Sequence, residues 1–198
     1  MPRLLELFSG TGSIGRAFAA QGWDVVSVDL DPHANATHCS DVAEWDYTCV
    51  GRVDVIWASP PCMNYSRARS RGGSRDLEPS DNLARKTLEI AAALGSPPLF
   101  IENPHSGDLK NRGIIELPMQ VVDYRKYGMP YRKRTAIWTN TGWMPARPLC
   151  KHDCHASDGK RHFATAQRGP PGPTFTQREL YRIPAVLCNE VAQFCNGR

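Results

Sequence analysis

The chain has 198 residues, 41% of them hydrophobic, with a formal net charge of +4 and a pI near 8.7. These values fit one domain with its own core, and the mild positive charge permits a polyanionic partner without indicating one. Seven irregularly spaced cysteines, with no charged-then-apolar signal segment at the start, argue against a disulfide framework. No apolar run approaches the roughly 20 residues that cross a bilayer. We therefore expect an intracellular monomer with reduced thiols and no membrane role.

The first half of the chain predicts alternating strands and helices. Residues 4–8 form a short apolar strand, residues 13–21 a helix with one apolar face, and residues 25–28 a second strand. A strand over 53–58, a long polar loop, a helix over 81–94 and a strand over 99–101 follow. This alternation is typical of a parallel α/β sheet.

The second half is less regular. Residues 120–123 and 135–139 predict antiparallel or edge strands, whereas residues 140–173 are rich in proline, glycine, cysteine and histidine and predict an irregular segment. A helix over 184–194 follows. We expect three parts: a core over 1–139, a small irregular region over 140–175, and a C-terminal part over 176–198 that packs back on the core.

A glycine-rich turn follows the first predicted strand. Gly10-Thr11-Gly12-Ser13-Ile14-Gly15 fits the G-x-G-x-x-G pattern, in which glycines let the backbone approach a ligand closely. Asp29 ends the second strand, where a carboxylate accepts hydrogen bonds from ribose hydroxyls, and Asp41 in the next loop is placed to reach an adenine amino group. The pattern fits a dinucleotide, S-adenosylmethionine or a purely structural turn.

Cys62 follows the apolar strand 53–58 and two prolines that fix the backbone. A cysteine is most often buried and inert, but the polar residues after Cys62 favour a reactive thiol. Nearby arginines would lower its pKa and make it a competent nucleophile. Glu102 follows the strand 99–101 and should emerge at the same edge of the sheet, suited to proton donation.

Four motifs occur in a fixed order along the chain: Glu6-Leu7-Phe8-Ser9-Gly10-Thr11-Gly12, Pro61-Cys62, Glu102-Asn103-Pro104 and Arg132-Lys133-Arg134. In this combination the chain resembles the cytosine-C5 DNA methyltransferases from about Leu4 to Trp138, with a weaker match over 176–192. The resemblance implies a Rossmann-like, S-adenosylmethionine-dependent methyltransferase sheet with a small irregular C-terminal region. It also implies methyl transfer to C5 of a flipped cytosine in double-stranded DNA.

The resemblance further implies roles for individual residues. Cys62 would attack C6 of the cytosine, Glu102 would hydrogen-bond N3 and the exocyclic amine, and Arg132 and Arg134 would steady the base or adjacent phosphates. A loop bearing Ser66, Arg67, Arg69, Arg71 and Arg75 would close over the flipped nucleotide. Residues at three strand ends would bind S-adenosylmethionine: Phe8, Ser9, Gly10, Thr11, Gly12, Ser13, Asp29, Leu30, Asp41, Val42 and Pro60.

The chain departs from the family pattern in four ways. The glutamine expected near the double-arginine motif is absent, and Pro130-Tyr131 stands in its neighbourhood. Met63 stands where glutamine usually follows the cysteine, and Pro104 stands where valine usually follows Glu-Asn. The target-recognition region is reduced to residues 140–175, which predicts short or loose sequence specificity. Compact forms of this kind resemble those encoded by phages and large viruses.

The reduced region also carries a possible metal site. Two cysteines and several histidines lie close together, and such residues bind zinc tetrahedrally and stabilise segments with little hydrophobic core. The spacing is not a standard zinc motif, so a polar loop without metal is the alternative. The candidate ligands are Cys150, His152, Cys154, His155 and His162.

Four alternatives to DNA C5 methylation stay open at this point. Backbone contacts by arginine serve RNA as well as DNA, so the same chemistry on RNA is the nearest. N4-cytosine methyltransferases also carry Ser-Pro-Pro, although they leave Glu102 unexplained. A nicotinamide oxidoreductase would use the glycine turn but neither Cys62 nor the arginine clusters. A catalytically inactive nucleic-acid-binding relative is the fourth.

Overall fold

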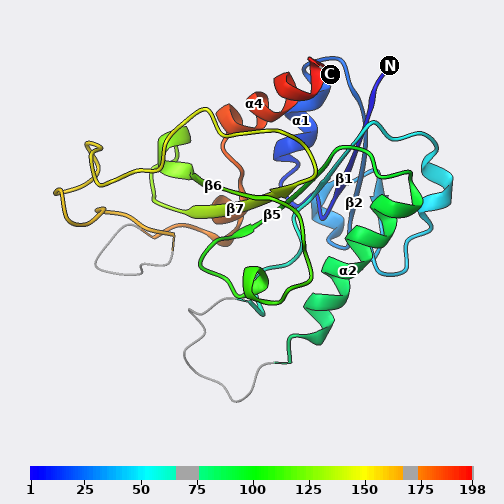
Figure 1. The fold of residues 1–198 in the computed structure, drawn as a ribbon, viewed down its shortest axis with the longest axis horizontal. Coiled ribbons are helices and arrows are strands. Elements are labelled where there is room, and N and C mark those ends of the chain that lie inside the picture. Colours follow the sequence, from blue (N-terminus) through cyan, green and yellow to red (C-terminus); the bar gives the residue numbers. More distant parts are fainter. Residues whose placement is uncertain (66–75, 167–173, 198) are drawn as a thin grey trace.

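The computed structural model describes residues 1–65, 76–166 and 174–197. Among these residues seven strands form one sheet in the order β3-β2-β1-β4-β5-β7-β6 (Figure 1). Strands β1 to β5 are mutually parallel where they pair, and β7 lies antiparallel between β5 and β6. The strands are β1 (Arg3–Leu7), β2 (Asp24–Asp29), β3 (His38–Cys39), β4 (Val55–Ala58), β5 (Leu99–Pro104), β6 (Met119–Asp123) and β7 (Arg134–Thr139).

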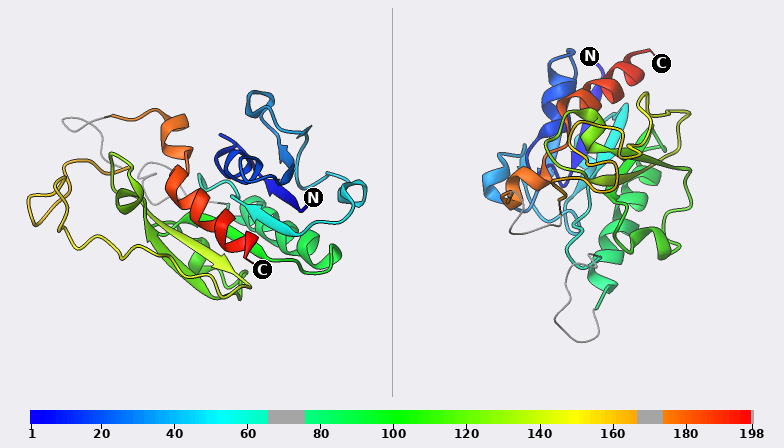
Figure 2. Two further views of the ribbon diagram at one scale, coloured as in Figure 1. Left: turned by 90° about the horizontal axis from the view of Figure 1, so that it is seen from above. Right: turned by 90° about the vertical axis from the view of Figure 1, so that its left-hand side faces the viewer.

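Helices cover both faces of the sheet (Figures 1 and 2). Helices α1 and α4 contact each other and pack on one face, and α2 packs on the other. The C-terminal helix thereby returns to the N-terminal part of the chain, where the Trp23 indole donates a hydrogen bond to Asn196. The helices are α1 (Ser13–Ala19), α2 (Glu78–Ala93), α3 (Gln177–Tyr181) and α4 (Ala185–Asn196).

The central strands are apolar on both faces because each face is covered by helices. In β1, Leu4 packs toward α1 and α4, whereas Leu5 and Leu7 pack toward α2. In β4, Trp57 packs toward α1 and α4, and Ile56 packs toward α2. Successive side chains of a strand point to opposite faces, so a strand buried on both sides reads as a continuous apolar run.

The predicted α/β class and the parallel order of the first strands are confirmed. The predicted strands 120–123 and 135–139 are indeed antiparallel to their neighbours. Helix α2 begins at Glu78, earlier than predicted, and the short helix α3 was not predicted although Thr176 and Glu179 form a capping box. None of the helices in the described ranges is long and apolar enough to span a membrane.

Candidate active site

The turn after β1 exposes its backbone at the carboxyl edge of the sheet. Phe8, Gly10 and Gly12 have φ values of 57°, 49° and 61°. The amide of Gly10 donates a 2.7 Å hydrogen bond to the Asp29 carboxylate at the end of β2. A Cβ on Gly10 would meet only the Phe8 carbonyl, at 3.9 Å, so the turn faces open space. The turn and Asp29 therefore form one unit that a ligand can approach closely.

The residues predicted to bind S-adenosylmethionine differ in their exposure and in their hydrogen bonds. Leu30, next to Asp29, is 68% exposed and is free to pack against a flat ring. The Ser9 hydroxyl is buried and has no hydrogen-bond partner within the described part of the chain. Asp41 caps its own turn by accepting the Ala43 amide, and Val42 packs in the core.

Glu6 supports the glycine turn from below. Its carboxyl group is buried in β1 and accepts hydrogen bonds from the backbone amides of Ile14 and Gly15 at the start of α1. Burial raises the pKa of Glu6 to about 7, and the two amides offset part of that rise. A Cβ on Gly15 would lie 2.5 Å from Oε2 of Glu6, so glycine is required there by close packing.

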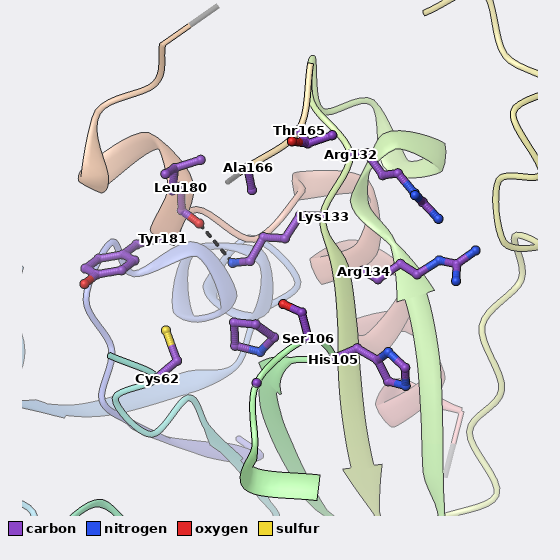
Figure 3. Close-up of a pocket in the computed structure, with 12 residues that line it drawn as sticks. Cys62, His105, Ser106, Arg132, Lys133, Arg134, Thr165, Ala166, Leu180 and Tyr181 are labelled. Carbon is purple, nitrogen blue, oxygen red and sulfur yellow. Dashed lines mark hydrogen bonds between the residues drawn. The ribbon is translucent and has the colours of Figure 1, made fainter. Parts of the chain in front are cut away.

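A pocket of about 440 Å³ opens beside Cys62. Figure 3 shows that its walls come from five parts of the chain: the turn after β4, the segment at the end of β5, the start of β7, the segment around 165 and the segment around 180. A pocket of this size is large enough for a ligand of small-molecule size. Its lining includes Cys62, His105, Ser106, Arg132, Lys133, Arg134, Thr165, Ala166, Leu180 and Tyr181.

The thiol of Cys62 is less acidic than predicted. Burial raises its pKa above the usual range, the charge of Glu102 raises it further, and Lys133 partly offsets both. The prediction that nearby arginines depress this pKa is therefore wrong for the ligand-free site. The predicted loop residues Ser66, Arg67, Arg69, Arg71 and Arg75 lie outside the described residues.

Glu102 is held in a fixed position within β5, which extends beyond the predicted strand 99–101 to Pro104. Its side chain is 7% exposed, and the buried hydroxyl of Tyr124 donates a 3.0 Å hydrogen bond to Oε1. Burial and the charge of Glu102 raise the pKa of Tyr124 well above its usual value, so the phenol keeps its proton and remains a donor. Tyr124 was not among the predicted site residues.

Polar contacts fix the chain on both sides of Cys62. The side chain of Asn103 donates a 2.9 Å hydrogen bond to the Pro60 carbonyl, which ties the turn after β4 to the end of β5. Beyond Cys62, the Tyr65 hydroxyl donates to Asp81 at 2.8 Å, and Asp81 is in turn paired with Arg112. These contacts hold the backbone of the cysteine in place before any substrate binds.

The side chains of Arg132, Lys133 and Arg134, just before and at the start of β7, point in different directions. Lys133 extends toward the Cys62 side of the pocket and donates a 2.9 Å hydrogen bond to the Leu180 carbonyl (Figure 3). Arg132 and Arg134 extend away from Cys62, and Arg132 contacts Asp123 at 3.3 Å. Sequence reasoning missed Lys133, although alternation along an extended segment would have separated it from its two neighbours.

The predicted metal residues are only partly brought together. One potential ligand atom from each of Cys150, Cys154 and His162 lies within 4.8 Å of the other two. The ring of His152 lies 4.6 Å from that of His162. His155 instead contacts the guanidinium of Arg125 at 2.7 Å and stands apart from this group.

Comparison with known proteins agrees with the geometry. The family model for C-5 cytosine-specific DNA methylases matches residues 2–111, more than half of the chain. The chain belongs to this family. A Frog virus 3 (isolate Goorha) protein named as a DNA (cytosine-5)-methyltransferase is 39% identical, over 98% of this chain and 100% of the viral protein. The predicted family resemblance, including its compact viral form, is thus confirmed.

More distant relatives of this C-5 cytosine-specific DNA methylase are longer. Type II methyltransferase M.AplI of Arthrospira platensis is 25% identical over 87% of this chain and 55% of its own. The structures of Entamoeba histolytica EhMeth and Spodoptera frugiperda DNMT2 share the fold, with TM-scores of 0.55 and 0.52 and identities of 13% and 21%. They are matched over 76% and 75% of this chain, which spans only 58% and 53% of theirs.

Proposed function

We propose that this chain transfers a methyl group from S-adenosylmethionine to C5 of cytosine in DNA, through a covalent bond between Cys62 and C6 of a flipped base. One observation carries the proposal. Cys62 and Glu102 follow or end the adjacent parallel strands β4 and β5 at the same edge of the sheet. They are close enough that the charge of Glu102 raises the pKa of the thiol.

The turn after β1 supports S-adenosylmethionine as the donor. Bound there, S-adenosylmethionine would supply an electrophilic methyl group on a sulfonium sulfur. The open backbone of Gly10 and the unpartnered Ser9 hydroxyl fit its methionine part. Asp29 fits its ribose and the exposed Leu30 its adenine.

Cys62 and Glu102 would act in turn on the base. The Cys62 thiol loses its proton to solvent, and the thiolate adds to C6 while Glu102 delivers a proton to N3. The addition breaks the aromaticity of the ring and leaves C5 nucleophilic. Transfer of the methyl group to C5 would leave S-adenosylhomocysteine. Loss of the C5 proton to solvent, return of the N3 proton to Glu102 and cleavage of the Cys62–C6 bond would then restore the aromatic ring and the free thiolate.

Two further residues would support this chemistry. Tyr124 occupies Oε1 of Glu102, which leaves Oε2 to face the base. Lys133 favours the thiolate form of Cys62 because its positive charge lowers the pKa of the thiol. Both act on the reacting groups rather than on the base itself.

The nucleic acid would lie across the basic side of the pocket. Arg134 is exposed and lines the pocket, so it is suited to a phosphate next to the flipped base. Ser66, Arg67, Arg69, Arg71 and Arg75 are proposed to close over the base from the loop after Cys62. Cys150, Cys154 and His162 support a second bound group, a structural zinc ion.

Nucleoside mass spectrometry tests the reaction and its substrate. Duplex DNA and structured RNA are incubated in parallel with the protein and S-adenosylmethionine labelled in its methyl group, with Cys62→Ala as the control. We expect labelled 5-methylcytosine from DNA with the wild type and none with Cys62→Ala. Product from RNA alone would reassign the substrate, and labelled N4-methylcytosine would refute the role of Cys62.

A further inference from the structure

The cysteine and histidine cluster after β7 has the size of a zinc site. Cys150 and His162 are 0% and 3% exposed, and Sγ of Cys150 lies 3.2 Å from Nε2 of His162. In a tetrahedral zinc site, bond lengths of about 2.3 Å to sulfur and about 2.1 Å to nitrogen put neighbouring ligand atoms roughly 3.5 to 3.8 Å apart. The separations among the potential ligand atoms of Cys150, Cys154 and His162, at most 4.8 Å, are compatible with one shared ion after small side-chain adjustments.

Two buried imidazole nitrogens next to the cluster have no partner. Nδ1 of His162 and Nδ1 of His152 are buried without a hydrogen bond among the described residues, and the two rings lie 4.6 Å apart. Leaving such a group unsatisfied is unfavourable. Because Nε2 of His162 faces Cys150, Nδ1 of His162 does not bind the same ion, and the unpartnered Nδ1 of His152 is the atom that fits a fourth ligand. His152 also has a positive φ of 67°, a conformation that a non-glycine residue adopts only under local constraint.

Two other polar residues near the cluster already bind other side chains, which leaves His152 as the candidate for the fourth zinc ligand. His155 contacts Arg125 at 2.7 Å, and Asp153 accepts a 2.9 Å hydrogen bond from Lys126. His152 has no comparable commitment at Nδ1 and lies against His162. The set is thus two thiols and two imidazoles, a combination that zinc prefers.

Few apolar contacts stabilise the segment 154–163, which carries two of these residues. Phe163 is 55% exposed, and the chain from 154 to 163 is joined mainly by backbone hydrogen bonds, including those of Ser157 to Cys154 and Phe163 to Ala156. A short segment without an apolar core gains its folding free energy from a bound metal in many small proteins.

The cluster is linked by backbone to the catalytic pocket. Three residues after His162, Thr165 forms a parallel bridge with Arg132. The Arg132 amide donates to the Ala164 carbonyl and the Ala166 amide donates to the Arg132 carbonyl, both at 3.0 Å. Thr165 and Ala166 face the pocket that contains Cys62 (Figure 3).

We propose that Cys150, His152, Cys154 and His162 bind one structural zinc ion, which holds residues 163–166 in place as a wall of the catalytic pocket. The zinc site stands on the cluster alone, whereas the function of the wall rests on the proposed methyl transfer.

Metal analysis and cobalt substitution test the site. Protein purified without chelator should contain about one equivalent of zinc, and cobalt added after zinc removal should give the thiolate charge-transfer and intense d–d bands of a tetrahedral site. We expect Cys154→Ser to lose these bands and His152→Ala to weaken zinc binding at least roughly tenfold. His155→Ala is the matched control and should keep both.

The outcomes separate the two parts of the proposal. Less than about half an equivalent of zinc in the wild type, or equal losses in His152→Ala and His155→Ala, would overturn the site or its fourth ligand. If Cys154→Ser fails to fold, the comparison of the two histidine variants still decides. Zinc removal should reduce DNA methylation at least roughly tenfold and added zinc should restore it; unchanged methylation would overturn the role of the wall. A zinc-loaded protein that never methylates would refute the proposed function while leaving the site intact.

Discussion

Replacing Gly15 by alanine tests the close packing beneath the S-adenosylmethionine turn. Gly15 lies inside α1, where helix propensity alone predicts a gain of about 1 kcal/mol from alanine. The added Cβ, however, would lie 2.5 Å from Oε2 of Glu6 and 3.1 Å from Cγ1 of Val25. Both neighbours belong to strands of the central sheet, so neither moves away easily. The two effects therefore have opposite signs.

The clash should prevail. Overpacking costs about 2 kcal/mol, and weakening one hydrogen bond between the Glu6 carboxyl group and an amide costs about 1.5 kcal/mol. Against the gain of about 1 kcal/mol in helix propensity, Gly15→Ala should lower the free energy of unfolding by about 2.5 kcal/mol. For a chain of this length that corresponds to a fall of about 5 to 10 °C in Tm.

Thermal and urea unfolding measure the effect, with two controls. A Cβ on Gly142 meets nothing within 4 Å, so Gly142→Ala should stay within about 0.5 kcal/mol of the wild type. In a Glu6→Ala background the opposing oxygen is gone and only the contact with Val25 remains, so Gly15→Ala should cost less stability there than in the wild type. A Tm for Gly15→Ala at or above that of the wild type would refute the reasoning.

Three more predictions concern ionisation and hydrogen bonding. Burial keeps the thiol pKa of Cys62 high, so alkylation of Cys62 by iodoacetamide, followed by peptide mass spectrometry, should rise about tenfold per pH unit below that pKa. Lys133→Met should move this profile to higher pH, and an unchanged profile would contradict the role of Lys133. Tyr124→Phe should slow methyl transfer about tenfold without changing S-adenosylmethionine affinity, and calorimetry showing weakened donor binding would argue against a role confined to Glu102. Burial raises the pKa of Glu6 to about 7, so its contribution to stability is fully present below about pH 4.5 and is lost as the pH rises through 7, by about 3 kcal/mol. Glu6→Gln should abolish this part of the difference in unfolding free energy between pH 5 and pH 8, measured by urea titration. An unchanged difference would exclude Glu6 as its source.

Local signals made much of the fold predictable. The continuous apolar runs of β1, β4 and β5 indicate strands covered on both faces, and the glycine turn marks the start of α1. The placement of β7 between β5 and β6 could not be read from local sequence, because it depends on the pairing of Glu102 with Ile137 and its neighbours. Sequence could assign these strands but not their order.

The reacting groups of the site could be predicted from the sequence, whereas the residues that hold them in position could not. Cys62 and Glu102 follow from strand ends, since parallel strands bring their carboxyl ends together. Tyr124 was missed because its contact with Glu102 joins elements distant in sequence, and the contact of Asn103 with Pro60 could not be predicted for the same reason. The pKa of Cys62 was predicted in the wrong direction because composition indicates nearby arginines but not the burial of the thiol.

Covalent trapping on fluorinated DNA tests the central claim most directly. With fluorine in place of hydrogen at C5, no C5 proton can be lost, so the bond between the cysteine and C6 should persist after methyl transfer. Duplex DNA carrying 5-fluorocytosine is incubated with the protein and S-adenosylmethionine, digested, and mapped by mass spectrometry. We expect a modified cytosine on the peptide that contains Cys62. Formation of 5-methylcytosine on ordinary DNA without such an adduct, or an adduct on another cysteine, would contradict the role of Cys62 as the nucleophile.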